Sequence, residues 1–142
     1  MPLKKKSNTQ ALRAKCLVAI QLLSRISAAD GLGFAECVSC GKHQNYKSMD
    51  GGHFIPKGSS SFWALKIENV HPQCRPCNAF GMKHGSAAQS YTLWMQDYYG
   101  RDFVENMLYT KNNISKLYKA DYEDMLKQFN DLIKFHKDRI GE

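Results

Sequence analysis

The chain has 142 residues, 43% of them hydrophobic and 23% charged, which is an ordinary globular composition with room for one domain and a modest core. No apolar run approaches the roughly 20 residues of a membrane span, and the basic N-terminus lacks the apolar stretch of a secretory signal, so we expect a cytoplasmic protein. The net charge is +8 over residues 1–84 and −1 over residues 85–142, which favours an anionic partner such as nucleic acid for the first part.

The N-terminal region, residues 1–33, is predicted to be a basic tail followed by one helix. The tail carries Lys4, Lys5 and Lys6. Over residues 9–28, apolar side chains recur at spacings of three and four without an internal Gly or Pro, which predicts an amphipathic helix. The run Asp30-Gly31-Leu32-Gly33 predicts its end.

Residues 34–84 lack helical periodicity and are rich in Gly, Ser, Cys and His, as is typical of loops and short strands around a metal ion. We predict a compact ββα unit, with strands near 46–56 and 62–70 and a helix that begins near Pro76 and Asn78.

The C-terminal region, residues 85–142, becomes helical again. Its apolar spacing predicts helices over 87–98, 101–108 and about 119–139. We expect all three regions to form one compact domain. The apolar stripes of residues 87–98 and 122–140 could serve a homodimer or could pack within the chain.

Four of the five cysteines form two C-x-x-C pairs separated by 33 residues. Each pair offers two thiolates from a tight turn, and the two pairs together match a closed, structural zinc site. An iron–sulfur cluster and free thiols are the alternatives. The predicted ligands of one Zn²⁺ per chain are Cys37, Cys40, Cys74 and Cys77.

Three polar residues follow in register with these pairs: His53 in D-G-G-H-F-I-P-K-G, Asn69 in E-N-V-H-P-Q, and Asn78 in C-R-P-C-N. Their order resembles the HNH signature, whose zinc-bearing members carry one C-x-x-C before the histidine strand and a second beside the last motif residue. The runs D-x-G-H-aromatic-I-P-K-G and N-V-H-x-Q-C-x-x-C-N are similar to those of the phage NinG (Rap) recombination-protein family. The resemblance covers about residues 34–84 and extends weakly into the C-terminal helices.

The resemblance implies an α+β fold: a zinc-stapled ββα-metal (HNH) nuclease core flanked by an N-terminal helix and C-terminal helices. It also implies roles for the motif residues. His53, with an ordinary pKa near 6.5, would accept a proton from the attacking water, although a histidine merely hydrogen-bonded in the core is the alternative. Asn69 would orient the histidine or tether a loop, and Asn78 would offer a carbonyl oxygen to Mg²⁺ or Mn²⁺.

The second ligand of that ion is where the sequence departs from the family pattern. The residue before the HNH histidine is usually Asp or His, but here it is Gly52. Asp50 is the nearest carboxylate and is the preferred candidate, with His71 or His84 as alternatives.

The predicted function is metal-dependent hydrolysis of DNA phosphodiesters in branched recombination intermediates such as Holliday junctions, D-loops and forks, in a bacterial host's cytoplasm if the chain is phage-encoded. An HNH nicking or restriction-type enzyme acting on linear duplex is one alternative, and a non-catalytic zinc module that binds DNA is another. Candidate phosphate contacts, each of which could be plain surface charge, are Lys57, Arg75, Lys83 and the tail lysines Lys4, Lys5 and Lys6.

Overall fold

The computed structural model describes residues 7–142, so the lysine tail at 4–6 lies outside the described residues. The first helix, α1 (Asn8–Ala28), matches the predicted span. Ser7 caps it, since the Ser7 Oγ accepts from the backbone N–H of Gln10 and the Gln10 side chain accepts from that of Ser7. The predicted apolar stripe lies in the core, with these members buried: Cys16, Ala19, Ile20, Leu23 and Ile26.

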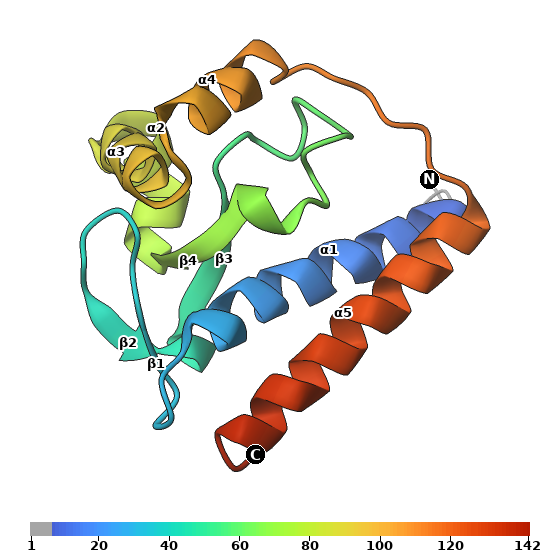
Figure 1. Ribbon diagram of the computed structural model, residues 1–142, viewed down its shortest axis with the longest axis horizontal. Coiled ribbons are helices and arrows are strands. Elements are labelled where there is room, and N and C mark those ends of the chain that lie inside the picture. Colours follow the sequence, from blue (N-terminus) through green and yellow to red (C-terminus); the bar gives the residue numbers. More distant parts are fainter. Residues whose placement is uncertain (1–6) are drawn as a thin grey trace, which may run out of the picture.

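The C-terminal helix, α5 (Lys119–Arg139), lies beside α1 and runs in the same direction (Figure 1). Its Tyr122, Phe129 and Ile133 are buried in the same apolar cluster as the α1 stripe. At the far end, the Arg139 guanidinium donates to the carbonyl of Ala29 at 2.8 Å. This apolar stripe is therefore covered within the chain.

Two antiparallel hairpins follow α1: β1 (Phe34–Glu36) with β2 (His43–Asn45), and β3 (Met49–His53) with β4 (Val70–Cys74). The first hairpin was not predicted, because its strands are only three residues long. The β3–β4 hairpin lies between α1 on one side and α3 and α4 on the other (Figure 1). Its register pairs Asp50 with Gln73 and Gly52 with His71.

The second predicted strand, over 62–70, is wrong, because the strand is Val70–Cys74. Residues 61–65 form turns, and Ile67–Asn69 is a 3₁₀ helix. The three consecutive residues Trp63, Ala64 and Leu65 are all buried, whereas a strand covered on one face would bury alternate residues. The apolar run thus reflects a buried loop. The first predicted strand, over 46–56, is shorter than expected and is preceded by a 3₁₀ turn, Tyr46–Ser48.

Helical structure begins directly after β4, as predicted. Residues 75–84 are helical, with a π-helical turn at Cys77–Gly81 followed by α2 (Met82–His84). The helices α3 (Ala87–Tyr99) and α4 (Arg101–Tyr109) then form a second apolar cluster over the other face of the hairpin. The fold is α+β, and no helix within residues 7–142 is long and apolar enough to span a membrane.

Gly51 in β3 is required by the approach of α1. A Cβ at this position would stand 2.5 Å from the backbone carbonyl oxygen of Gln21 and 2.7 Å from the Ser24 Oγ. Because the helix backbone cannot move aside alone, we expect Gly51→Ala to lower the free energy of unfolding by about 1–3 kcal/mol, the usual range for overpacking a core. Thermal or urea unfolding measures this. Gly31→Ala is the matched control, since its Cβ would meet nothing within 4 Å. Equal stability of the two variants would contradict the close approach of α1.

Candidate functional site

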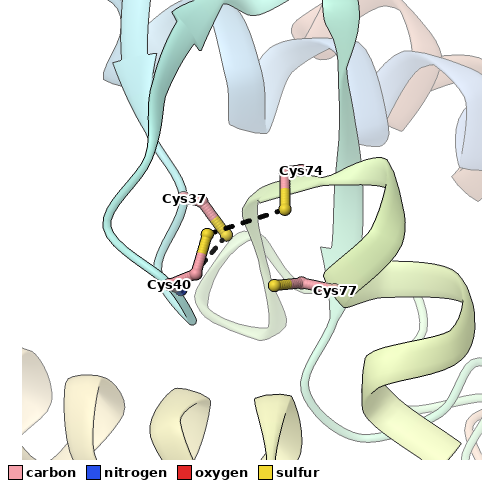
Figure 2. A group of neighbouring side chains, drawn as sticks. All are labelled: Cys37, Cys40, Cys74 and Cys77. Atoms are coloured by element: carbon pink, nitrogen blue, oxygen red, sulfur yellow. Dashed lines mark hydrogen bonds between the residues drawn. The ribbon is translucent and has the colours of Figure 1, made fainter. Parts of the chain in front are cut away.

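The four paired cysteines form one cluster, which the β1–β2 loop and the β4–helix junction build together (Figure 2). All four sulfur atoms lie within 4.8 Å of one another, and the Cys40 and Cys74 sulfurs are 3.7 Å apart. Tetrahedral Zn–S bonds of about 2.3 Å place their sulfurs roughly 3.8 Å apart, so the cluster could hold a structural metal ion such as zinc. Gly41, whose φ is +77°, allows the tight turn in which its N–H donates to the Cys37 carbonyl.

The four thiols lie close enough to influence one another's ionisation. Burial, followed by the neighbouring thiols, raises the pKa of Cys77, and burial also raises the pKa of Cys74. At Cys37 burial is outweighed by hydrogen bonds from neighbouring backbone N–H groups, which lower the pKa. Four crowded thiolates would repel one another without a positive ion between them, and a structural metal ion would remove this repulsion.

His53 is the last residue of β3, and its ring is fixed by one backbone contact. The Nε2 atom lies 2.8 Å from the carbonyl oxygen of Ala64. Since a carbonyl only accepts, Nε2 carries the proton and the lone pair of the neutral ring is on Nδ1. Burial lowers the pKa of His53 below its ordinary value, the Ala64 bond opposes this shift, and the charges of Lys57 and Arg13 add to it. The ring is thus a neutral base at pH 7.

Asn69 is fully buried and tethers the loop that carries this carbonyl. Its Oδ1 accepts from the N–H of Ile55 at 2.7 Å, and its Nδ2 donates to the carbonyls of Ile55 and Trp63 at 2.9 and 3.1 Å. Of the two roles weighed for Asn69, these contacts match the loop tether. The side chain positions Ala64, and through it His53, without touching the histidine ring.

Asp50 and Asn78 lie together. The Asn78 Nδ2 donates to the Asp50 Oδ2 at 3.1 Å, and the Arg75 guanidinium lies 3.8 Å from the Asp50 Oδ1. The exposed Arg75 side chain keeps one positive charge beside this pair. By the alternation of β3, Asp50 and Gly52 face one side of the hairpin and His53 faces the other.

His71 is held by two tyrosines. The Tyr91 hydroxyl donates to the carbonyl of Gly52 at 2.8 Å, so its oxygen can only accept from the His71 Nδ1 at 3.0 Å. The His71 Nε2 then accepts from the Tyr99 hydroxyl at 2.8 Å, and burial lowers the pKa of His71 to about 4. Neither ring nitrogen is left for a metal ion. The alternative ligand His71 thus receives no support, and His84 lies exposed with its ring against Phe80.

The predicted phosphate contacts are exposed, as such contacts must be: Lys57, Arg75 and Lys83. The structure adds a half-buried basic residue that sequence reasoning missed. Arg13 of α1 lies close enough to His53 to lower the pKa of the ring, although 39 residues separate them in the chain. Only the packing of α1 on the hairpin joins them, so no sequence motif could have revealed this neighbour.

Position 73 was also missed as part of the site. Gln73 lies fully buried opposite Asp50, and the point where a Gly52 Cβ would stand is 1.7 Å from the Gln73 Oε1 and 3.0 Å from the Asn78 Oδ1. The only sequence signal was the departure from the family pattern at Gly52.

Comparison with known proteins gives one finding. No curated protein and no solved structure matches the chain. A family model described as the bacteriophage lambda NinG protein matches residues 21–139, which include both C-x-x-C pairs, His53, Asn69 and Asn78, and all of α5. The chain therefore belongs to the bacteriophage lambda NinG family, a phage family associated with recombination.

Proposed function

We propose that the chain is a metal-dependent DNA endonuclease of the HNH (ββα-metal) kind. The observation that carries this proposal is the state of His53, a half-buried histidine whose Nε2 is fixed on the Ala64 carbonyl while Nδ1 keeps its lone pair. Every neutral imidazole keeps one such lone pair, and what distinguishes His53 is that two basic residues, Lys57 and Arg13, lie near its ring. A strand, a second strand and a helix follow in the order that the HNH resemblance implies.

In the proposed reaction, the His53 Nδ1 takes a proton from the water that attacks phosphorus. Lys57 and Arg13 would hold the phosphate beside the ring, and their charges add to the burial that lowers the pKa of His53. In-line attack needs the water and the leaving oxygen on opposite sides of phosphorus. A base on one side of β3 and the Asp50–Asn78 pair on the other fit this requirement.

The Asp50–Asn78 pair would hold Mg²⁺ or Mn²⁺. A carboxylate and an amide carbonyl are oxygen ligands of the kind that these hard ions take. When bound, such an ion would neutralise the charge that develops on the leaving oxygen. The contacts of Asp50 with Asn78 and Arg75 would hold its carboxylate in position for such an ion.

Branched DNA is the proposed substrate class, and family membership carries this part of the proposal. A basic surface alone binds any duplex, so preference for a junction must come from its shape. Basic residues at two places, the lysine tail and the surroundings of His53, could contact two converging arms together. Such double contact raises affinity through effective concentration without reading any base.

We expect cleavage of four-way junctions or forks to be at least about tenfold faster than cleavage of linear duplex at near-physiological salt, a difference of about 1.4 kcal/mol. The test uses purified full-length protein with Mg²⁺ or Mn²⁺ on sequence-matched substrates across a salt series. Deleting residues 1–6 should lower the ratio of the cleavage rates on branched and linear DNA more than it lowers the rate of the chemical step.

The other outcomes separate the alternatives. Equal cleavage of branched and linear DNA would leave a nicking or restriction-type nuclease acting on duplex. Binding without cleavage under either metal would leave a non-catalytic zinc module.

A further inference from the structure

Gln73 carries a buried acceptor that no protein donor satisfies. The residue is fully buried, and its Oε1 has no hydrogen-bond partner among the described residues. An acceptor left unpaired in this way loses its hydrogen bonds to water without replacement, so native proteins pair such atoms with a donor, a water molecule or an ion. Since no atom of residues 7–142 donates to this oxygen, its partner would be a water molecule or an ion.

Ser39, which lies between Cys37 and Cys40, fixes the orientation of the Gln73 amide. Its Nε2 donates to the Ser39 Oγ at 2.9 Å, and the Ser39 hydroxyl donates to the carbonyl of Ala87 at 2.9 Å. Since the single hydroxyl proton of Ser39 is already given to Ala87, Ser39 can only accept from Gln73. The amide nitrogen must face Ser39, which turns the Oε1 away from it.

That oxygen points to the Asp50–Asn78 pair. The Gln73 Oε1 and the Asn78 Oδ1 lie 1.7 and 3.0 Å from the point where a Gly52 Cβ would stand. Because the Asn78 Nδ2 donates to Asp50, its Oδ1 is left facing the same place. Two amide oxygens that converge beside a carboxylate form a region of negative potential, and oxygens of these kinds are the ligands that Mg²⁺ and Mn²⁺ take.

We propose that the Gln73 Oε1 is a ligand of the divalent ion at Asp50 and Asn78, in place of the side chain that Gly52 lacks. This inference rests on the proposed function, because it names a further residue of the same metal site. It also explains why position 52 is glycine: any Cβ there would overlap the Gln73 carboxamide. Gln73 on β4 would thus supply the ligand that the HNH pattern expects from position 52 on β3.

The test measures Mn²⁺ binding to zinc-loaded, full-length protein by electron paramagnetic resonance, without DNA and without an activity readout. We expect one Mn²⁺ per wild-type chain and at least tenfold weaker binding by Gln73→Met, which keeps the volume but removes the oxygen. Gln73→Glu keeps the oxygens and loses the donor to Ser39, so it should bind Mn²⁺ at least as tightly as wild type. The double variant Gly52→Asp/Gln73→Ala should recover binding by returning a carboxylate to position 52.

Gln44→Met is the matched control, since the Gln44 Oε1 is also buried without a partner but lies on β2, outside this pair. Zinc content and thermal melting report whether each variant folds. Wild-type affinity in Gln73→Met would overturn the inference, as would equal losses in Gln73→Met and Gln73→Glu, or a wild type that binds no Mn²⁺. If Mn²⁺ binding depends on Gln73 but the protein does not cleave DNA, the proposed nuclease function is contradicted and the ligand role of Gln73 is not. If the protein cleaves DNA but its Mn²⁺ binding does not depend on Gln73, the ligand role is contradicted and the nuclease function is not.

Discussion

Replacing His53 by alanine is expected to lower the rate of DNA cleavage by roughly 10²–10⁴, the range for loss of a general base, while DNA affinity changes little. The reason is that, in the proposed reaction, the Nδ1 lone pair would act on water, whereas Lys57 and Arg13 would contact phosphate. Single-turnover cleavage measures the rate, and binding measured with Ca²⁺ in place of Mg²⁺ gives the affinity. The fold should persist, because the ring makes a single hydrogen bond, to Ala64.

The pH profile of the wild type gives a second readout of the same group. Burial, aided by two nearby positive charges, lowers the pKa of His53 from its ordinary value near 6.5. The base is active when neutral, so kcat/KM should stay level at neutral pH and fall as pH drops through this lowered pKa. In His53→Ala this acid limb should disappear.

The matched control is His43→Ala. His43 lies exposed on β2, where its Nε2 is 3.8 Å from the Glu36 carboxylate. The rate of DNA cleavage by His43→Ala should equal that of wild type. A His53→Ala protein that cuts at a near wild-type rate with the same metal would show that another group takes the proton.

The helices could be predicted from the sequence because each signal is local. Spacing of apolar residues predicted α1 and α5 almost to the residue, and the helix predicted over 87–98 matches α3 within one residue. The second strand could not be placed in the same way. Trp63 and its neighbours look like a strand by composition, but they form a buried loop that hydrogen bonds from distant residues hold in place, among them those of Asn69 and Asn113.

The same distinction between local and long-range signals applies to the residues of the site. The two C-x-x-C pairs carry their own spacing, and the sequence predicted a cluster that the structure brings together. Arg13, Ser39 and Gln73 could not be found, because each acquires a role only when separate strands or helices meet. The choice between Asp50 and His71 needed the hydrogen bonds of Tyr91, which lies 20 residues beyond His71.

Removing one metal ligand is expected to have the largest effect on folding. In Cys74→Ser, the cluster loses a buried sulfur ligand, and the link that a metal ion would make between the β1–β2 loop and β4 is weakened. A structural zinc site contributes about 10–16 kcal/mol in small zinc peptides, which matches or exceeds the roughly 5–15 kcal/mol that stabilises a whole domain. Three-residue strands are also too short to hold a hairpin alone. We therefore expect loss of bound zinc, loss of cooperative melting in the central region, and no cleavage.

Cys16→Ser separates this effect from simple damage to the core. Cys16 is fully buried in α1, its thiol donates to the carbonyl of Tyr122 at 3.4 Å, and it is not a member of the four-cysteine cluster. A hydroxyl can keep that bond, so the variant should retain one zinc per chain and lose only about 1 kcal/mol of stability. Metal analysis of both proteins, followed by melting with and without a chelator, gives the comparison. The prediction of a structural metal ion would be contradicted if Cys74→Ser melts like wild type. It would also be contradicted if the wild type holds no metal and its melting temperature does not change with the chelator.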